Sequence, residues 1–260
     1  MSKFNAKFLS ITGGIVYLDN DAFTGIAFAV GDSGIVSPAQ YFDGRQVELT
    51  ASFGGVPYGD VQIVDRGCVY QGDYNSGPGI FDDALYSGIA IEFDQEGCRC
   101  IREELFSNGE SVLEVEYDEA CSIRSWSGFI DSRFAMSYDL DAKNEIRRFS
   151  LIDPDSVEDR VYIDLDSDGG VYNIFLGRIY KEEPALVSRS MSLSGLRRDW
   201  IGRFPLSSRL LLGGKSMDDD FIDQVMANPT FSNVKEISFS NTSVSERVME
   251  RLSGRVNIGV

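Results

Sequence analysis

The amino-acid sequence predicts an α+β fold, mainly an antiparallel β-meander of repeated hairpins followed by a small strand–helix unit. Two self-similarities predict it. A spacing of 63 residues relates two segments in the first half of the chain, and a spacing of 27 residues relates two segments near the C-terminus. We expect the meander over residues 1–180 and the strand–helix unit over residues 185–260. The break is expected near Lys181–Pro184, where charge and proline interrupt the alternation.

The 63-residue spacing aligns Leu18–Phe28 with Phe81–Ile91, and Gly34 with Gly97. In both copies apolar residues alternate along the chain, which is the pattern of a strand with one buried face. The residues expected on that face are Ile26, Phe28 and Val30 in the first copy and Ile89, Ile91 and Phe93 in the second. Asp43-Gly44 and Asn108-Gly109 predict two-residue hairpin turns, because type I′ turns need positive φ at both central residues.

The 27-residue spacing aligns Leu210–Asp219 with Ile237–Glu246. Each copy is typical of a short strand, a polar turn and an amphipathic helix. Asp218 and Ser245 are the expected N-caps, since a side-chain oxygen there accepts a hydrogen bond from a first-turn amide. Asn228-Pro229 is expected to end the first helix, because the residue before a proline disfavours helical geometry.

The first pattern resembles the degenerate MORN-type repeats of bacterial antitoxin-like and immunity-like proteins, over residues 15–125. The matching residues are Phe23, Gly25, Gly34, Phe42, Asp43 and Gly44 in one copy and Tyr86, Gly88, Gly97, Phe106, Asn108 and Gly109 in the other. The chain departs from that family because the glycine usually found a few residues after the Asn-Gly turn is absent in both copies. The 27-residue unit resembles leucine-rich repeats, whose units span about 20 to 29 residues.

The 260-residue chain carries 24 Lys and Arg against 41 Asp and Glu, has a formal charge of −17 and contains no histidine. The missing histidine excludes Ser-His-Asp and Cys-His catalysis, histidine-liganded zinc and imidazole pH switching. The acidic balance argues against nucleic-acid and anionic-membrane partners, because both require a positive face. We therefore expect a basic protein as the partner.

No stretch of the sequence approaches the ~20 apolar residues that span a bilayer, and the N-terminus does not read as a signal peptide. The four cysteines, Cys68, Cys98, Cys100 and Cys121, are too few for a disulfide framework. They are expected to be reduced structural thiols, and the expected location is the cytoplasm.

Two short motifs resemble ligand-binding loops, but each lacks a residue that its ligand requires. Residues 164–169 match the first half of an EF-hand loop, but the position that needs a bidentate carboxylate is Phe175. Residues 213–216 contain Gly-Lys-Ser, but the first glycine of a phosphate-binding loop would fall at Arg209. We interpret the first as an acidic hairpin turn and the second as a strand-to-helix turn, and expect neither a metal nor a cofactor.

Acidic side chains gather in three clusters, the largest running from Glu92 to Glu119 with ten carboxylates against two arginines. Each cluster alone is more often a solvated face, but together they favour contact with a cationic surface. The candidate partner-binding residues are Glu92, Asp94, Glu114, Glu116, Asp118, Asp164, Asp166, Asp168, Asp218 and Asp219.

The leading hypothesis is a non-catalytic binder, an immunity or antitoxin-type protein that occludes a basic, nucleic-acid-degrading toxin. The alternative is a scaffold or adaptor that presents Asn241, Thr242 and the C-terminal strand face to a protein or peptide. An enzyme is the third hypothesis. The 41 carboxylates make chance pairs common, and no spacing favours one pair as general acid and base.

Overall fold

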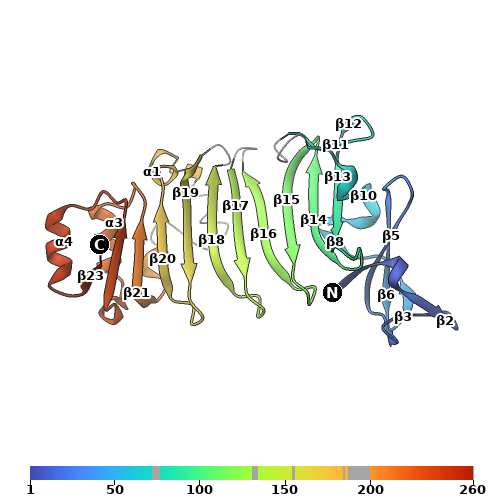
Figure 1. Ribbon diagram of the computed structural model, residues 1–260, viewed down its shortest axis with the longest axis horizontal. Coiled ribbons are helices and arrows are strands. Elements are labelled where there is room, and N and C mark those ends of the chain that lie inside the picture. The colour runs from blue at the N-terminus through green and yellow to red at the C-terminus, as the bar shows by residue number, and fades with distance from the viewer. Residues whose placement is uncertain (72–76, 131–133, 154–155, 184, 187–199, 260) are drawn as a thin grey trace. The chain divides into compact units, whose positions relative to one another are not determined.

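The computed structural model describes residues 1–71, 77–130, 134–153, 156–183, 185–186 and 200–259. The fold is mainly β with few helices, as the sequence predicts (Figure 1). The chain divides into two compact units, Met1–Ser132 and Arg133–Val260. In the described part of the chain, no helix has the length and apolar character to cross a bilayer.

The first unit begins with a module of residues 2–47, which we call the first module. Its strands are β1 (Ser2–Asn5), β2 (Ser10–Thr12), β3 (Ile15–Leu18), β4 (Asp21–Ala22), β5 (Gly25–Val30), β6 (Val36–Phe42) and β7 (Arg45–Val47), with the 3-10 helix η1 (Ala6–Phe8) after β1. One sheet has the order β1-β5-β6-β7 and a smaller one the order β2-β3-β4. Strand β1 pairs with β5 in parallel, which the prediction of an antiparallel meander did not include.

A connecting segment holds β8 (Ser52–Phe53), β9 (Val56–Pro57) and the 3-10 helix η2 (Tyr58–Asp60). The second module, residues 63–117, contains β10 (Ile63–Asp65), η3 (Arg66–Cys68), β11 (Ile80–Phe81), β12 (Ala84–Leu85), β13 (Gly88–Phe93), β14 (Cys100–Ser107) and β15 (Glu110–Tyr117). Strand β16 (Ile123–Ile130) follows. The sheet order is β10-β13-β14-β15-β16, and again the first strand, β10, pairs in parallel with its neighbour.

Backbone hydrogen bonds at corresponding positions of the two modules form the same closed triangle. In the first, the Phe23 amide donates to the Val16 carbonyl (2.9 Å), Val16 to Gly44 (2.8 Å) and Gly44 to Phe23 (2.8 Å). In the second, Tyr86 donates to Gly79 (2.8 Å), Gly79 to Gly109 (2.6 Å) and Gly109 to Tyr86 (2.7 Å). Each triangle ties a hairpin turn to the start of a buried strand.

The two predicted turns have the dihedral angles that their sequences require. Asp43 and Gly44 have φ of 48° and 72°, and Asn108 and Gly109 have φ of 50° and 81°. The turn amides of Asp43 and Asn108 donate to the hydroxyls of Thr24 (2.9 Å) and Ser87 (2.7 Å). The sequence prediction of both turns is therefore confirmed.

The core of the first unit lies on both faces of β5 and β13, not on one. Ile26 and Phe28 enter a central cluster with Ile89 and Ile91, whereas the intervening Ala27 packs in a separate cluster with Val16, Phe23 and Tyr41. Ala90 occupies the matching position beside Tyr86 and Phe106. The strands therefore lose their alternation where two clusters flank them. The prediction that Val30 is a core residue is wrong, since it is 38% exposed at the strand end.

A buried polar cluster crosses the central core. The Lys3 ammonium on β1 pairs with Glu103 on β14, whose residue is 0% exposed, and donates to the hydroxyls of Tyr58 (2.9 Å) and Tyr117 (2.8 Å). Both tyrosines donate to the Glu103 carboxylate. Burial, then the Glu103 charge, raises the pKa of each phenol above its usual range, so both stay protonated donors.

The second unit is a sheet of order β17-β18-β19-β20-β21-β22-β23. Strands β17 (Phe134–Leu140), β18 (Ile146–Asp153), β19 (Ser156–Leu165) and β20 (Val171–Leu176) pair antiparallel. Strands β21 (Leu206–Gly213), β22 (Glu236–Ser240) and β23 (Asn257–Gly259) continue in parallel. The boundary predicted near Lys181–Pro184 lies inside this unit, because β20 pairs directly with β21, and Pro184 lies outside the described residues.

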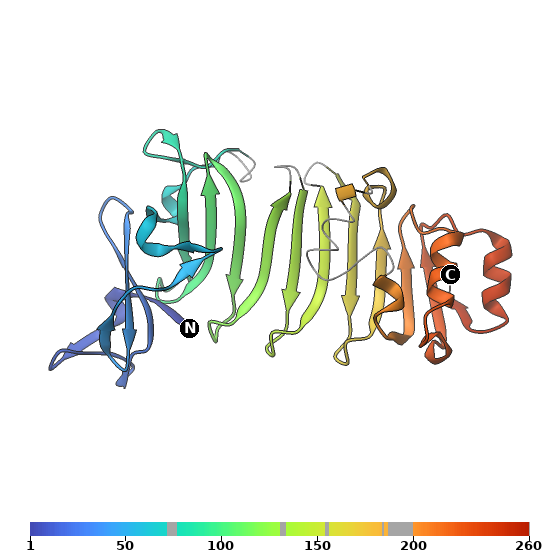
Figure 2. The ribbon, with the colours of Figure 1, turned by 180° about the vertical axis from the view of Figure 1, so that it is seen from behind.

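Short helices join the strands of the second unit: α1 (Ile179–Glu182), η5 (Trp200–Gly202), α3 (Asp219–Met226), η6 (Phe231–Asn233) and α4 (Glu246–Ser253). In Figure 2 the orange and red helices lie in front of the C-terminal strands. The predicted N-caps are confirmed: Asp218 accepts from the Phe221 amide (3.0 Å) and Ser245 from the Val248 amide (3.4 Å). Helix α3 ends two residues before Asn228, in agreement with the predicted stop at Asn228-Pro229.

Candidate protein-binding site

The two modules of the first unit contact each other reciprocally. The Asn5 amide at the end of β1 donates to the Cys98 carbonyl (2.7 Å), in the turn after β13. The Asp65 amide at the end of β10 donates to the Gly34 carbonyl (2.7 Å), in the turn after β5. Each module therefore places the end of its first strand against the hairpin turn of the other.

A pocket of about 940 Å³ opens where these contacts meet. The 3-10 helices η1 and η3 line it together with the ends of β5 and β13. The two helices begin in the same way: Asn5 accepts from the Lys7 amide (3.1 Å) and Asp65 from the Gly67 amide (2.9 Å). Because the two 3-10 helices begin alike, Ala6 on η1 and Arg66 on η3 occupy matching positions in the lining. The charge at this position therefore differs between the η1 side and the η3 side of the pocket.

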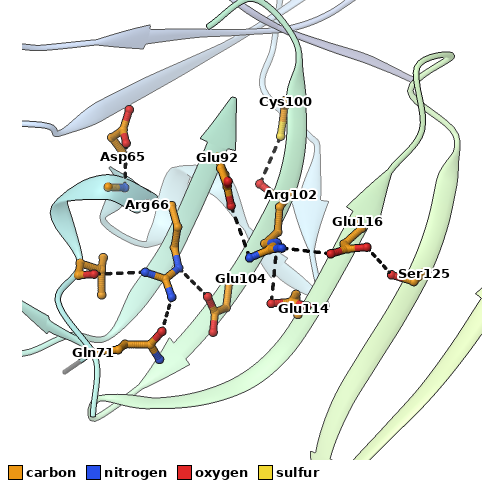
Figure 3. Close-up of polar contacts among 12 residues, drawn as sticks. Asp65, Arg66, Gln71, Glu92, Cys100, Arg102, Glu104, Glu114, Glu116 and Ser125 are labelled. Atoms are coloured by element: carbon orange, nitrogen blue, oxygen red, sulfur yellow. Dashed lines mark hydrogen bonds and ion pairs between the residues drawn. The ribbon is translucent and has the colours of Figure 1, made fainter. Parts of the chain in front are cut away.

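Arg102, which lines the pocket, is surrounded by three of the predicted partner-binding carboxylates (Figure 3). Its guanidinium nitrogens lie 3.4 Å from Glu92, 3.9 Å from Glu114 and 3.0 Å from Glu116. The strand register causes this, because Glu92, Arg102 and Glu116 are direct cross-strand partners on β13, β14 and β15. The Ser125 hydroxyl on β16 donates to Glu116 (3.1 Å) and extends the row.

Arg66 on η3 is the second cation beside the acidic strands. Its Nε donates to Glu104 (2.7 Å), one terminal nitrogen donates to the Val69 carbonyl (3.1 Å) and the other donates to Gln71 (Figure 3). The guanidinium also lies 5.7 Å from the centre of the Phe106 ring. Glu104 is buried, so this ion pair is desolvated and its geometry is held from several sides.

The pKa shifts of the side chains around Arg102 follow from the close spacing of the three carboxylates. Burial raises the pKa of Glu114, and Glu104 and Glu116 raise it further against the lowering effect of Arg102. Burial lowers the pKa of Arg102, but the three carboxylates outweigh burial and raise it overall. One guanidinium therefore holds three carboxylates, and the cluster keeps an excess of negative charge.

The remaining predicted acids of this unit are in hairpin turns. Burial raises the pKa of Asp94, but hydrogen bonds from the Cys98 amide (2.7 Å) and Arg99 (3.1 Å) lower it overall. Asp118 accepts from the amides of Ala120 and Ser122 (both 2.9 Å). Both side chains stabilise their own turns and do not join the row around Arg102.

The predicted acids of the second unit have local partners as well. Asp164 is buried between Arg148 and Asn173, and Asp166 accepts from Gly170 (2.8 Å) in the β19–β20 turn, beside the exposed Asp168. Residues 166–169 thus form the predicted hairpin turn, and Asp164 and Leu165 are the last residues of β19. Asp218 is the N-cap of α3. The Asp219 carboxylate accepts hydrogen bonds from the amide (2.8 Å) and the hydroxyl (2.7 Å) of Ser245. The Gly-Lys-Ser segment is the predicted strand-to-helix turn between β21 and α3.

Sequence reasoning missed the basic residues of the site: Lys7, Arg66 and Arg102. From the sequence, the stretch from Glu92 to Glu119 is expected to be a cluster of carboxylates that favours a cationic partner, with no role for its arginines. The register of β13 with β14, readable from the two alternating patterns and the intervening turn, would have placed Arg102 beside Glu92. Arg66 and Lys7 carry no such signal, because they reach the site from elements 36 and 95 residues away from Arg102.

No family model matches the chain, and no curated protein matches it. A solved chain described as the crystal structure of the GtfA/B complex bound to UDP and GlcNAc is similar over 89% of this chain, with 12% identity and a TM-score of 0.19. The match covers 39% of that chain, so this protein spans about two fifths of its length. A likeness of this size carries no argument about the fold or the function.

Proposed function

We propose that this protein is a non-catalytic, acidic binding protein of the bacterial immunity or antitoxin type, which acts in the cytoplasm by occluding a basic toxin. The two modules are, in this proposal, degenerate MORN-type repeats, and β21–β23 with their helices are a leucine-rich-repeat-like end. Toxins that degrade nucleic acid are often basic because they must hold phosphate, which makes an acidic inhibitor complementary to them.

The distribution of charge between the two units supports this proposal. Residues 1–132 contain 21 Asp and Glu against seven Lys and Arg, a formal charge of −14. Residues 133–260 contain 20 against 17, a formal charge of −3. Self-repulsion on this scale destabilises the free first unit, and a cationic partner would relieve it. We therefore assign the binding surface to the first unit, around Glu92, Glu114 and Glu116.

Capture of the partner tests the proposal. The tagged full chain is incubated with lysate of its native host, and retained proteins are eluted along a salt gradient and identified by mass. We expect one stoichiometric basic protein that elutes only at high salt. Retention of no basic protein, or only of proteins released by modest salt, would overturn the proposal.

Charge neutralisation locates the binding surface once a partner is in hand. The triple variant Glu92→Gln, Glu114→Gln, Glu116→Gln should slow association with the captured protein about tenfold at low salt and flatten its salt dependence. The control, Asp220→Asn, Glu246→Gln, Glu250→Gln, removes the same charge from the exposed surface of the second unit and should change the rate little. Equal effects of the two triples would contradict the assignment to the first unit.

The second candidate function is a scaffold that binds a peptide on the C-terminal strands. A groove of about 400 Å³ runs over β20–β22 and includes Leu211, which is 46% exposed, with Arg209 and Ser238. Deleting the C-terminal strands would uncover the edge of β20, so a point variant is the sharper test. Loss of partner binding in Leu211→Asp, with binding retained in the triple glutamine variant, would favour this function over the first.

A further inference from the structure

We propose that the pocket between the two modules receives an arginine side chain of the basic partner, and that Lys7 is the resident cation which this arginine displaces. The inference rests on the proposed function, because it specifies which part of the partner enters the acidic unit. The proposed function needs only an acidic surface, whereas this inference adds a specific role for the pocket and for Lys7.

The walls of the pocket suit a side chain with an apolar stem and a charged end. Ala29 and Val30 at the end of β5 and Phe93 on β13 supply apolar surface, against which the methylene groups of an arginine can pack. Glu92 lies on the same wall, and its side chain is 40% exposed. Its contact with Arg102 is long, at 3.4 Å, so its carboxylate has room to accept a second guanidinium.

The two arginines that line the pocket do not oppose an incoming cation. Every terminal nitrogen and the Nε of Arg66 already donates, to Glu104, Val69 and Gln71. Arg102 is shared among three carboxylates. Asp65 and Asp94 also line the pocket, and Asp94 is paired with Arg99. With the partners of all these side chains included, six carboxylates stand against four cations. The field inside the pocket therefore favours a positive ligand.

Lys7 is the lining cation for which the described residues provide no ion pair. Its ammonium lies 4.9 Å from the centre of its neighbour Phe8 and against the turn at Gly97, where an added Cβ would be 3.0 Å from Nζ. The side chain is exposed and long, so it can move aside at little cost. An arginine binds more strongly than lysine here because its planar fork bonds a carboxylate through two nitrogens.

The test uses the full chain and a probe with a single charge, acetyl-Gly-Arg-Gly-amide, with the citrulline peptide as its neutral isostere. Binding is followed by NMR shifts of backbone amides. We expect saturable shifts at η1, η3 and the end of β13 for the arginine peptide, and binding at least fivefold weaker for the citrulline peptide. Lys7→Gln should raise the affinity for the arginine peptide about two- to fivefold, and Glu92→Gln should lower that affinity by a similar factor.

Charge-matched variants of the second unit are the controls. Lys215→Gln and Asp220→Asn alter the same charges at exposed sites with no ion pair among the described residues, and should leave the affinity unchanged. Two results would overturn the inference. Weaker binding of the arginine peptide to the Lys7→Gln variant would indicate that the pocket takes an anionic ligand, and equal affinity for the arginine and citrulline peptides would indicate a neutral one.

The failure of this inference differs from the failure of the proposed function. If a basic protein is captured and neither Lys7→Gln nor Glu92→Gln changes its affinity for this chain, the pocket inference is overturned. The proposed binding function is then unaffected. Specific binding of the arginine peptide with no basic protein retained from lysate would support the pocket and overturn the proposed immunity function.

Discussion

At the scale of single residues, the acidic surface is an arrangement of partly neutralised side chains. Arg102 and Arg66 hold Glu92, Glu114, Glu116 and Glu104 in place, and neither arginine was expected to matter from the sequence. Crowded carboxylates of this kind lower the stability of the fold through their mutual repulsion. Under the proposed function, the charge of Glu114 would favour binding at the expense of stability.

Replacing Glu114 with glutamine should stabilise the folded protein slightly at neutral pH, by no more than about 1 kcal/mol. Burial raises the pKa of this carboxyl above its unfolded value. A carboxyl with a raised folded pKa loses stability as pH rises from the unfolded pKa through the folded one. The gain should therefore appear at pH 7 and vanish below about pH 4. Urea unfolding at the two pH values measures it, and a destabilised variant at pH 7 would contradict the expected sign.

At the scale of elements, the first strand of each module is held by contacts far along the chain. Strand β1 pairs in parallel with β5, and its Lys3 reaches Glu103 in the central core. Strand β10 pairs in parallel with β13, but Ile63 there contributes an apolar side chain to the same core. The two modules share a backbone arrangement while differing in the chemistry that stabilises it.

Lys3→Met should destabilise the protein by about 3–5 kcal/mol, because it leaves Glu103 as an unpaired buried charge. Adding Glu103→Leu should recover a substantial part of the loss, since no buried charge then remains. Equilibrium unfolding of the single and double variants measures both effects. Lys143→Met, at an exposed lysine, is the control and should be nearly neutral. A single variant within 1 kcal/mol of the parent would show that the buried pair is not a principal source of stability.

Gly44→Ala should destabilise the protein more than Gly13→Ala, by about 1–3 kcal/mol. Both glycines have positive φ, 72° and 61°, so the backbone strain is alike. At Gly44 the added methyl would also meet the Val16 carbonyl at 2.8 Å, inside the hydrogen-bonded triangle, whereas at Gly13 it meets nothing within 4 Å. Thermal unfolding of the two variants separates contact from strain. Equal losses would show that the triangle tolerates expansion.

At the scale of the whole molecule, charge is divided unequally between the two units. The first has a formal charge of −14 and the second −3, although their sizes are nearly the same. The sequence shows the total of −17, but its assignment to one compact unit depends on where the chain divides. That division places the acidic field, the pocket and the row around Arg102 in one unit.

Salt should stabilise the first unit more than the second. Raising NaCl from about 0.05 to 0.5 M shortens the Debye length to a few ångströms and screens the self-repulsion of the first unit. Hydrogen exchange of the buried amides in β13–β15 should slow more than that of β18–β20. Because the second unit is an internal reference, general salt effects cancel. Equal slowing in both units would show that unequal charge has little effect on their stability.

Local sequence patterns are sufficient to predict the local structure: the turns at Asp43-Gly44 and Asn108-Gly109, the caps at Asp218 and Ser245, and the predominance of strands. These depend on the φ preferences of a few residues and on short-range alternation, which a linear pattern contains. Long-range packing produces the parallel pairing of β1 with β5 and of β10 with β13, the two-sided core of β5, the pairing of Lys3 with Glu103 and the pocket. Each of these joins residues distant along the chain, and their proximity arises from packing that no local pattern encodes.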